Sequence, residues 1–329
     1  MANPARVLSG NRPTGPLHLG HYFGALENWV RLQNSGEYHC FFMSADWHAL
    51  TTGYNDTSQF LRFRREMFAD WIAVGIDPKK STLFTQAAVP EHGELSTLLG
   101  MLTPIPWLER VPSYKEMRQE LSDRDLSTIG FLGYPLLQTA DIVIYKATHV
   151  PVGEDQVAHV ELSRKIVRRF NSYYKPVFPE PQSLLAKTRR LVGLDGRKMS
   201  KSYNNAVYLS DSKEEIKKKV MPAPTDPARI KRTDPGNPEI CNIYSYQTIF
   251  QDELSLKEIE TGCRTAAIGC VDCKKQLLEK LEIFLEPIRE KRQLILASSD
   301  LDDAIAQGNA VARAEAQKTM IEVREAMGL

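Results

Sequence analysis

The fold class of this chain is decided by residues 6–21, RVLSGNRPTGPLHLGH. The apolar beginning of this stretch is typical of a short strand, and its glycines and prolines end that strand in a tight loop. Beyond the loop we expect a helix that begins near Gly20 and continues through Trp29 and Leu32. A strand, a glycine-containing loop and a helix in this order indicate a nucleotide-binding α/β unit.

Helix and strand patterns keep alternating to about residue 200. Cys40–Met43 and Thr82–Phe84 are apolar runs that we expect to be buried parallel strands. Between them we expect a helix capped by Thr57 or Ser58 and ended by Gly75. Its packed face is predicted to carry Leu61, Met67, Phe68, Trp71 and Ile72. Such alternation favours the α/β class with a doubly wound, Rossmann-like parallel sheet.

The pattern changes after Ser202. Residues 211–220 are basic and acidic by turns, and the segment Met221–Pro238 that follows is rich in proline. Two long helical patterns come next, one around Leu277–Ile288 and the other from Ala310 to Met327. We therefore place an α/β domain in residues 1–203 and a smaller, all-helical domain in residues 204–329.

Composition is that of an ordinary globular protein, with 42% hydrophobic and 25% charged residues among 329. Lys and Arg number 42 and Asp and Glu 41, so a nucleic-acid partner would have to bind a local basic patch. The start shows no cationic, apolar leader, and no apolar run is long enough to span a membrane. We expect a cytoplasmic protein with no membrane partner, whose five cysteines form no disulfide frame.

The first motif with chemical content is His18-Leu19-Gly20-His21. A helix N-terminus offers free N–H groups to phosphate. Gly20 lacks a Cβ, so that a base or ribose can approach the backbone, and two imidazoles can donate hydrogen bonds to phosphate oxygens. Taken alone, the tetrapeptide could also be two surface histidines beside a turn.

The second motif is Lys198-Met199-Ser200-Lys201-Ser202, in a short loop after Asp195-Gly196. Its two ammonium groups can hold a departing pyrophosphate. Alone, a solvated basic loop is the simpler interpretation. The two motifs in this order on one α/β domain are far more specific than either is by itself.

With both motifs the chain resembles the class I aminoacyl-tRNA synthetases, and in particular the bacterial tryptophanyl-tRNA synthetases. Further matching segments are residues 8–15, 45–51, 107–110, 134–141, 150–156 and 225–239. The resemblance covers essentially the whole chain. It implies that L-tryptophan is activated with Mg²⁺ and ATP and loaded onto tRNA(Trp), by a homodimer with no DNA partner.

Several site residues follow from this resemblance. The catalytic residues it implies are His18, His21, Lys198 and Lys201. The ATP contacts it implies are His21, both lysines, Arg12, Pro13, Thr14, Gly20, Gly153, Glu154, Asp155, Met199, Ser200 and Ser202. Residues 153–156 match the adenosine-binding turn of the family, between an expected strand and an expected helix from Gln156 to Asn171. Arg12 departs from relatives that carry Gln.

The implied tryptophan pocket is lined by a helix from Tyr134 to Tyr145, through Tyr134, Gln138 and Asp141. Asp141 matches the carboxylate that accepts the indole N–H. Indole has one donor and no acceptor, so a site built around this hydrogen bond rejects phenylalanine strongly. The alternative is a structural helix contact of Asp141. Gln138 stands where many relatives have Met.

Four cysteines, Cys241, Cys263, Cys270 and Cys273, have the spacing C-x21-C-x6-C-x2-C. Four thiolates can hold a [4Fe–4S] cluster or a zinc ion, but zinc sites usually show two close pairs. A subset of the resembled family carries a [4Fe–4S] motif whose first spacer is one residue longer, a difference that a loop tolerates. We expect the cluster, in a helical domain that meets the anticodon, with zinc or free thiols as alternatives. Cys40 is expected in the core.

Three other functions compete with this interpretation. A tyrosyl-tRNA synthetase would need polar partners for a phenol. A nucleotidyltransferase with an H-x-G-H motif would lack the Lys198 loop and the helical part of the chain. A non-catalytic RNA-binding or redox-sensing paralogue would not need intact His18, His21, Lys198 and Lys201.

Overall fold

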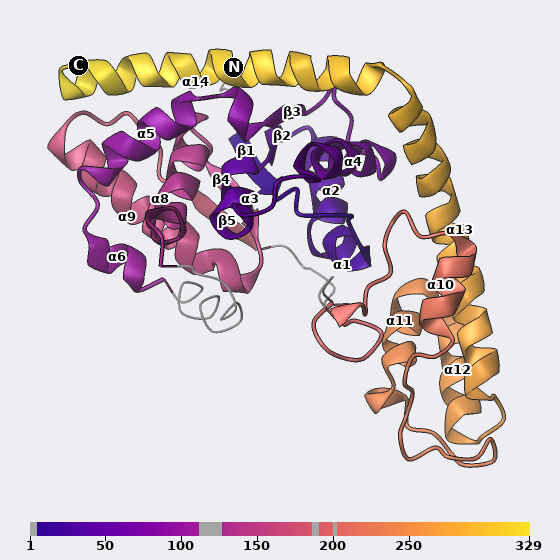
Figure 1. The fold of residues 1–329 in the computed structure, drawn as a ribbon. Coiled ribbons are helices and arrows are strands. Elements are labelled where there is room, and N and C mark those ends of the chain that lie inside the picture. The colour runs from indigo at the N-terminus through magenta and orange to yellow at the C-terminus, as the bar shows by residue number, and fades with distance from the viewer. Residues whose placement is uncertain (1–4, 112–126, 186–190, 200–202) are drawn as a thin grey trace. The chain divides into compact units, whose positions relative to one another are not determined.

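A computed structural model describes residues 5–111, 127–185, 191–199 and 203–329 (Figure 1). The chain forms two compact units, and neither is one continuous stretch of sequence. The first unit contains Met1–Gly15, Glu27–Lys187 and Ile295–Leu329, and the second contains Pro16–Leu26 and Thr188–Leu294. In the part of the chain described here, no helix is long and apolar enough to cross a membrane.

The first unit is built on a five-stranded sheet in the order β3-β2-β1-β4-β5. The strands are β1 (Ala5–Asn11), β2 (Tyr38–Ser44), β3 (Thr82–Thr85), β4 (His149–Val152) and β5 (Gln182–Leu185). All neighbouring strands are parallel. The chain moves outward from β1 to β3 and then returns to the other side of β1. The predicted α/β class with a doubly wound parallel sheet is therefore confirmed.

Helices surround this sheet. Its α-helices are α2 (Glu27–Ser35), α3 (Asp46–Gly53), α4 (Phe60–Ala73), α5 (Glu91–Gly100), α6 (Ile105–Glu109), α8 (Ile129–Ile144), α9 (Val157–Tyr173) and α14 (Asp300–Met327). Short 3₁₀ turns, η2 (Gln86–Ala88) and η3 (Glu154–Gln156), follow β3 and β4.

The two faces of the sheet are covered by different helices, as β2 illustrates. Its consecutive residues Phe41 and Phe42 point to opposite faces, because side chains alternate along a strand. Phe42 stacks on Trp29 of α2, with ring centroids 4.6 Å apart, and Trp29 in turn meets Trp71 of α4. Phe41 stacks on Tyr145, which follows α8. The unit thus has helices on both faces of its sheet.

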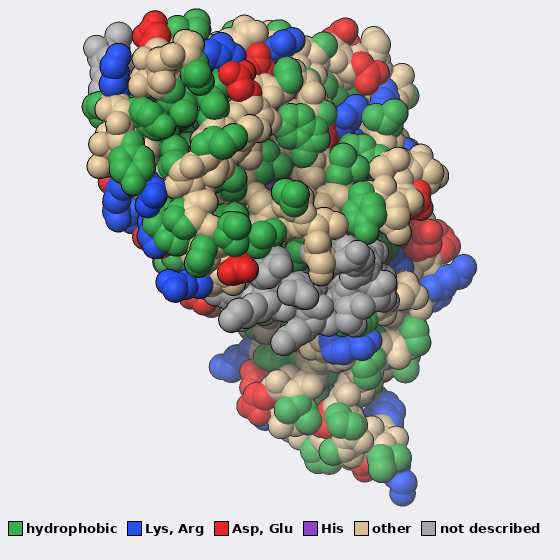
Figure 2. Space-filling model, turned by 60° about the vertical axis from the view of Figure 1, so that its left-hand side comes forward, with side chains coloured by type: hydrophobic (Ala, Val, Ile, Leu, Met, Phe, Trp, Pro, Cys, Tyr) green, Lys and Arg blue, Asp and Glu red, His purple; other side chains and the backbone are tan. Residues whose placement is uncertain are grey.

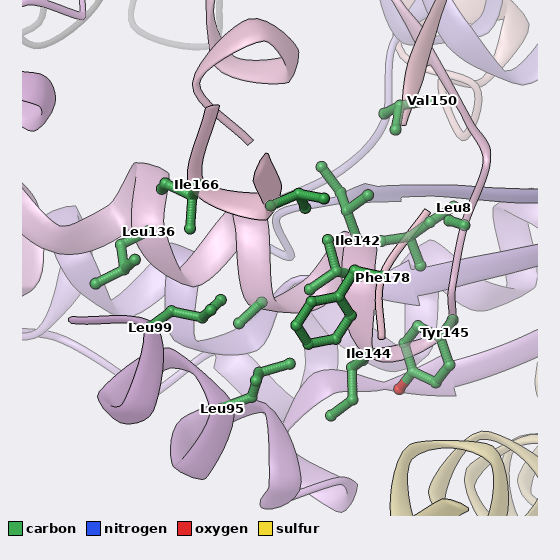
Figure 3. Close-up of a cluster of buried hydrophobic side chains, with 14 of the residues drawn as sticks. Leu8, Leu95, Leu99, Leu136, Ile142, Ile144, Tyr145, Val150, Ile166 and Phe178 are labelled. Atoms are coloured by element: carbon green, nitrogen blue, oxygen red, sulfur yellow. The ribbon is translucent and has the colours of Figure 1, made fainter. Parts of the chain in front are cut away.

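The α8 side of the sheet holds a large apolar core (Figure 3). Its labelled members come from α5, α8, α9, the strands β1 and β4, and the segments that follow α8 and α9, and they include Leu95, Leu99, Leu136, Ile142 and Ile166. All five are buried. Because α8 is packed on this side along its length, side chains on its other face have fixed positions, and the candidate site residues lie there.

Most local expectations hold in this unit, with two exceptions in α4. The expected cap is wrong, because α4 begins at Phe60 and its N-cap residue Gln59 makes no side-chain cap. Leu61 was expected on the packed face but is 68% exposed. Gly75 ends the helical region with a φ of +118°, which favours glycine. Cys40 is fully buried, as expected, and burial raises the pKa of its thiol to about 11.

The last helix, α14, belongs to the first unit, so the expected boundary near residue 203 does not describe how the chain divides. In Figure 1 it runs beside the edge strand β3, which it contacts. At Gly308 the approach is so close that a Cβ would lie 1.8 Å from the carbonyl oxygen of Leu83. The buried residues along the same helix are Leu301, Gly308, Ala312, Ala316, Thr319, Met320 and Val323. Small residues allow a helix to pack this closely. The partner strand β3 lies more than 200 residues earlier in the chain, so the local sequence of α14 does not predict this contact.

Ion pairs add to this attachment. Arg6 meets Glu315 at 2.8 Å, and Arg324 meets Glu94 at 2.6 Å. These pairs are partly exposed, so each contributes little by itself. Apolar packing and the close approach at Gly308 are the main reasons why α14 stays on the sheet.

The described part of the second unit is mainly helical, as expected for the part of residues 204–329 that it contains. It contains α1 (Leu19–His21), η1 (Tyr22–Leu26), α10 (Lys213–Val220), η5 (Pro238–Ile240), α11 (Asn242–Phe250), α12 (Glu253–Arg264) and the greater part of α13 (Cys270–Ala297). Phe23 stacks on Phe284 and meets Phe250 edge-on, with ring centroids 6.0 and 5.7 Å apart. This aromatic cluster ties residues 16–26 to helices far away in sequence.

Replacing Gly308 with Ala tests the contact between α14 and β3. The added methyl group would collide with backbone, so we expect the free energy of unfolding to fall by about 1–3 kcal/mol, the usual cost of overpacking. Denaturant titration followed by circular dichroism measures this. Gly133→Ala is the matched control, because Gly133 is also inside a helix and its Cβ would meet nothing within 4 Å. Its stability should rise by up to about 1 kcal/mol. Equal effects of the two changes would contradict the close approach.

Candidate active site and cysteine cluster

One face of α8 carries the three residues expected to bind an amino acid. Tyr134, Gln138 and Asp141 are spaced by four and three residues, so they share one side of the helix. The helix begins after Thr128, whose side chain caps it by accepting a hydrogen bond from the N–H of Phe131. The structure therefore places all three residues on one face of α8, with Asp141 buried.

Asp141 is the centre of a buried polar network. Its Oδ1 lies 2.6 Å from His92 Nδ1 and 2.8 Å from Gln86 Nε2. Its Oδ2 lies 2.7 Å from His48 Nε2 and 3.0 Å from the same Gln86 nitrogen. Three donors thus surround a carboxylate whose side chain is only 2% exposed. They come from α3, η2 and α5, at or after the carboxyl ends of β2 and β3.

The charge of Asp141 follows from these partners. Burial alone raises the pKa of the carboxyl group, but His92 and His48 together outweigh it and lower the pKa to about 2. Asp141 is therefore ionised near neutral pH, when a carboxylate can only accept hydrogen bonds. Tyr145 completes the network, with its hydroxyl 2.7 Å from His92 Nε2. Burial, Asp141 and Glu91 raise the pKa of Tyr145, so its hydroxyl stays protonated.

The family resemblance points to Asp141 but assigns no role to His48, Gln86 or His92. His48 lies in a segment that carried the family resemblance, and Gln86 is the second residue after the third expected strand, Thr82–Phe84. Their position after parallel strands is where α/β sheets commonly place ligand-binding groups. That rule could have selected both residues. Nothing local marks His92, which reaches Asp141 only because α5 packs against α8.

The expected adenosine-binding turn has the expected context. β4 ends at Val152, Gly153 precedes η3, and α9 begins at Val157. Glu154 is exposed, and the side chain of Asp155 lies outside the described residues. In the loop after β1, Arg12 and Thr14 are exposed and Pro13 is buried.

In the second unit the H-L-G-H motif starts a short helix. His18 is its N-cap, and the backbone N–H of His18 donates to His21 Nδ1 at 3.1 Å. The centroids of the two imidazole rings lie 3.8 Å apart. The helix expected from Gly20 onward is not one continuous α-helix, because the π-helical turn η1 separates α1 from α2. Such turns interrupt the regular hydrogen-bond ladder and often occur at functional sites.

The two sequence motifs meet within this unit. The backbone N–H of Gly20 lies 3.3 Å from Met199 Sδ. A Cβ on Gly20 would lie 2.9 Å from His18 Nδ1 and 3.3 Å from Met199 Sδ. Gly20 was expected to be small for the sake of a ligand, whereas the structure shows that it also makes room for His18 and Met199.

The segment before the second motif is a tight turn. Gly193 N–H donates to the carbonyl of Arg197 at 2.7 Å, and Asn205 Nδ2 donates to Asp195 at 2.7 Å and to the carbonyl of Lys198 at 3.1 Å. Lys198 itself is exposed. Ser200, Lys201 and Ser202, named above as ATP contacts, lie outside the described residues.

The four clustered cysteines occupy three helix ends. Cys241 is the N-cap of α11, Cys263 is the second-last residue of α12, and Cys270 and Cys273 lie in the first turn of α13. Cys263 and Cys273 each interact electrostatically with Cys241 and Cys270, and they also interact with each other. Burial raises the pKa of Cys263 and raises that of Cys273 to about 11.

Nitrogen donors surround these sulfurs. Arg229 Nη1 lies 3.9 Å from Cys263 Sγ and 3.7 Å from Cys270 Sγ, and Gln247 Nε2 lies 3.3 Å from Cys273 Sγ. Among the residues that the structure describes, no three His, Cys, Asp or Glu side chains are arranged to hold one metal ion.

A doubly wound parallel sheet, with H-L-G-H after its first strand and K-M-S-K-S late in the chain, defines a class I aminoacyl-tRNA synthetase. The family model described as class I tRNA synthetases for W and Y matches residues 1–286. The chain therefore belongs to this family, which comprises the tryptophan and tyrosine enzymes.

Its relatives are similar over nearly their whole length. The tryptophan–tRNA ligase of Thermotoga maritima is 52% identical over 98% of this chain and 99% of its own. That of Aquifex aeolicus is 46% identical over 98% of this chain and 100% of its own. The crystal structure of Campylobacter jejuni tryptophanyl-tRNA synthetase with ADP and tryptophan is 33% identical, with a TM-score of 0.89, over 98% of this chain and 100% of that one.

Gly20→Ala tests the crowding around the first motif. The new methyl group would push against His18 and Met199, so we expect tryptophan-dependent pyrophosphate exchange to slow on the order of 100-fold, a typical result of misplacing catalytic groups. Gly24→Ala is the control, because a Cβ there would meet nothing within 4 Å. Wild-type exchange in the Gly20 variant would show that the close contacts do not matter for the reaction.

Proposed function

We propose that this chain activates L-tryptophan with ATP and transfers the tryptophanyl group to tRNA(Trp), releasing AMP and pyrophosphate. It is an enzyme, a tryptophan–tRNA ligase, as are its relatives at 52% and 46% identity. Within the structure, the observation that carries the substrate assignment is the buried, ionised carboxylate of Asp141, on the face of α8 that also carries Tyr134 and Gln138.

The reaction has two steps. The tryptophan carboxylate attacks the α-phosphorus of ATP, and pyrophosphate leaves to give tryptophanyl-adenylate. A hydroxyl of the terminal tRNA ribose then attacks the aminoacyl carbon, and AMP leaves. Mg²⁺ enters with ATP as part of the substrate. No side-chain nucleophile is needed, so positioning and charge stabilisation provide the rate.

The chain supplies groups suited to these tasks. We assign to His18 and His21 hydrogen bonds to phosphate oxygens, and to Lys198 and Lys201 the stabilisation of the departing pyrophosphate. The other ATP contacts we propose are Arg12, Pro13, Thr14, Gly20, Gly153, Glu154, Asp155, Met199, Ser200 and Ser202. The support for these roles is the family motif at each position and, for Gly20 and Met199, their contact in the structure.

Asp141 suits tryptophan better than tyrosine. The indole has one N–H donor and no acceptor, whereas a phenol both donates and accepts. An ionised carboxylate can only accept, and Tyr134 and Gln138 lie on the same face of α8 to contact the rest of the side chain. The tyrosyl alternative therefore has less support, in agreement with the names of the relatives.

Pyrophosphate exchange with alternative amino acids tests the function. We expect tryptophan, and neither tyrosine nor phenylalanine, to support exchange. Asp141→Ala should reduce the preference for tryptophan over phenylalanine by about 1–3 kcal/mol, the cost of leaving a buried donor unpaired. The control is Asp46→Ala, since Asp46 is another buried carboxylate of this unit, bonded to Ser44 and Arg64. It should cost stability but keep the preference. An unchanged preference in Asp141→Ala would remove Asp141 from substrate recognition.

We also propose that Cys241, Cys263, Cys270 and Cys273 hold a [4Fe–4S] cluster. Without a metal, the raised pKa values keep the partly buried thiols of Cys263 and Cys273 protonated, so a cationic cluster has to offset four thiolates. Four ligands of one zinc ion lie about 2.3 Å from it and hence close together, whereas cluster ligands bind four separate irons and stand further apart. The spacing C-x21-C-x6-C-x2-C contains one close pair instead of the two pairs that are usual for zinc, and this spacing is what favours a cluster.

Two cations are placed to offset the negative charge of such a site. Arg229 points at two of the sulfurs, and its other nitrogen is fixed 2.7 Å from the carbonyl of Ile268. Lys274 is buried beside the cysteines and donates to the carbonyls of Met221 and Ala223 at 2.7 Å. When bound, the cluster would join α11, α12 and α13, and we propose that it stiffens the surface that meets the tRNA anticodon.

Analysis of iron and acid-labile sulfide after anaerobic purification tests this site. We expect four of each per chain and a broad absorbance near roughly 400 nm. Cys270→Ala should lose the absorbance and impair tRNA charging, while pyrophosphate exchange stays near the wild-type rate. Cys40→Ala, which alters the one cysteine outside the set, should keep the cluster. Stoichiometric zinc without iron, or full charging by metal-free protein, would refute the cluster.

A homodimer is the third proposal, supported by exposed apolar side chains in the first unit. Met101, Ile105 and Ile129 are 76%, 59% and 92% exposed, and they lie at the ends of α5, α6 and α8, where α5 and α6 each contact α8. Figure 2 shows hydrophobic side chains gathered on the side of this unit that bears α5, α6 and α9. Patches of this kind commonly mark protein contacts.

Sedimentation velocity tests the oligomeric state. The wild-type chain should sediment as a dimer, and Ile129→Glu, which would place a charge in the contact, should shift it toward the monomer. Leu254→Glu is the control, because Leu254 is also highly exposed but belongs to α12. A wild-type monomer, or dissociation by the control alone, would contradict this surface.

A further inference from the structure

The carboxylate of Asp141 has no acceptor site left for a substrate. Two carboxylate oxygens offer about four lone-pair positions. His92 and Gln86 occupy Oδ1, while His48 and the same Gln86 nitrogen occupy Oδ2. An indole N–H can therefore reach Asp141 only by replacing one of these three donors.

Gln86 and His92 each form hydrogen bonds at both ends of the side chain's polar group. Gln86 is fully buried, and its Oε1 accepts a hydrogen bond from the backbone N–H of Trp47 at 2.9 Å, which fixes the orientation of the amide. His92 is also fully buried, with Asp141 on one ring nitrogen and Tyr145 on the other. Moving either side chain would leave two buried polar groups without partners, which is costly.

Only one ring nitrogen of His48 forms a hydrogen bond to the described residues. Its side chain is 12% exposed, against 0% for His92. Nε2 bonds to Asp141, and within the described residues Nδ1 has no hydrogen-bond partner. The ring lies edge-on to Tyr134, with centroids 6.3 Å apart, so it borders the face of α8 assigned to tryptophan. Rotating His48 away breaks one hydrogen bond and brings the imidazole toward solvent.

We infer that His48 is the exchangeable partner of Asp141: in the free enzyme it occupies the acceptor position on Oδ2, and the indole N–H of tryptophan takes its place. Gln86 and His92 act as positioning residues that hold the carboxylate throughout. This inference rests on the proposed role of Asp141 in binding tryptophan.

The exchange would add to specificity. Tryptophan replaces the hydrogen bond from His48 with one of its own. A ligand of the same shape without an N–H breaks the bond between His48 and Asp141 and gives nothing back, so it is penalised. The site therefore favours a ligand with an N–H in two ways. Asp141 offers an acceptor for the N–H, and a ligand without one would break the hydrogen bond from His48 without replacing it.

Nitrogen-15 NMR of histidine-labelled enzyme tests the exchange. His48→Gln and His92→Gln identify the two ring systems, and His39→Gln, in β2, removes an unrelated signal as a control. We expect saturating tryptophan to abolish the signature of the hydrogen bond between His48 Nε2 and Asp141 and to leave the His92 signals in place. Persistence of the His48 bond in the tryptophan complex, or loss of the His92 bond instead, overturns the inference.

Binding measurements give a second, independent readout. Removing the competing donor with His48→Ala should leave the Kd for tryptophan unchanged or lower, and a higher Kd contradicts the exchange. A ligand with sulfur in place of the indole N–H, β-(3-benzothienyl)-L-alanine, separates the two levels of the argument. If Asp141→Ala leaves the preference for tryptophan over this analogue unchanged, the proposed role of Asp141 fails. If that preference is lost but His48 stays bonded in the complex, only the exchange is wrong.

Discussion

A negative charge inside the protein has to be offset, and the carboxylate of Asp141 imposes this constraint on the first unit. Its hydrogen-bond donors come from three separate elements. α3, η2 and α5 must therefore all be positioned against α8 closely enough to form hydrogen bonds with Asp141. The apolar core that packs against α8 makes this positioning possible, because a helix packed along its length has a fixed orientation. The proposed tryptophan site and the packing of the sheet thus depend on the same contacts.

Closure of the sheet edge follows a different rule. An uncovered edge strand exposes backbone groups and invites unwanted pairing. Here β3 is covered by α14, the last helix of the chain, which approaches closely because Gly308 has no side chain. The first and last parts of the chain are therefore joined in one unit, and the helical segment between them forms another. For this reason the two compact units differ from the two domains that the sequence pattern predicts on either side of residue 203.

In the second unit, small residues again bring distant segments together. Gly20 leaves room for His18 and Met199, so the two motifs assigned to ATP touch one another. Gly236 does the same near the cysteines, because a Cβ there would lie 2.6 Å from Cys263 Sγ. Three helix ends supply the four thiols, and the donors around them are held by backbone carbonyls. Both features of this unit are thus built where helices begin or end.

The sequence by itself determined the parallel α/β class, the strands around Val7, Phe41 and Leu83, and the family, because alternation of elements and short motifs are local properties of a chain. It also identified Asp141 through the resemblance. Only the tertiary structure decided that His48, Gln86 and His92 converge on that carboxylate and that α14 closes the sheet. These features depend on contacts between residues 49 to 222 positions apart. Such contacts are set by packing and by the need to pair buried polar groups, and local patterns do not record them.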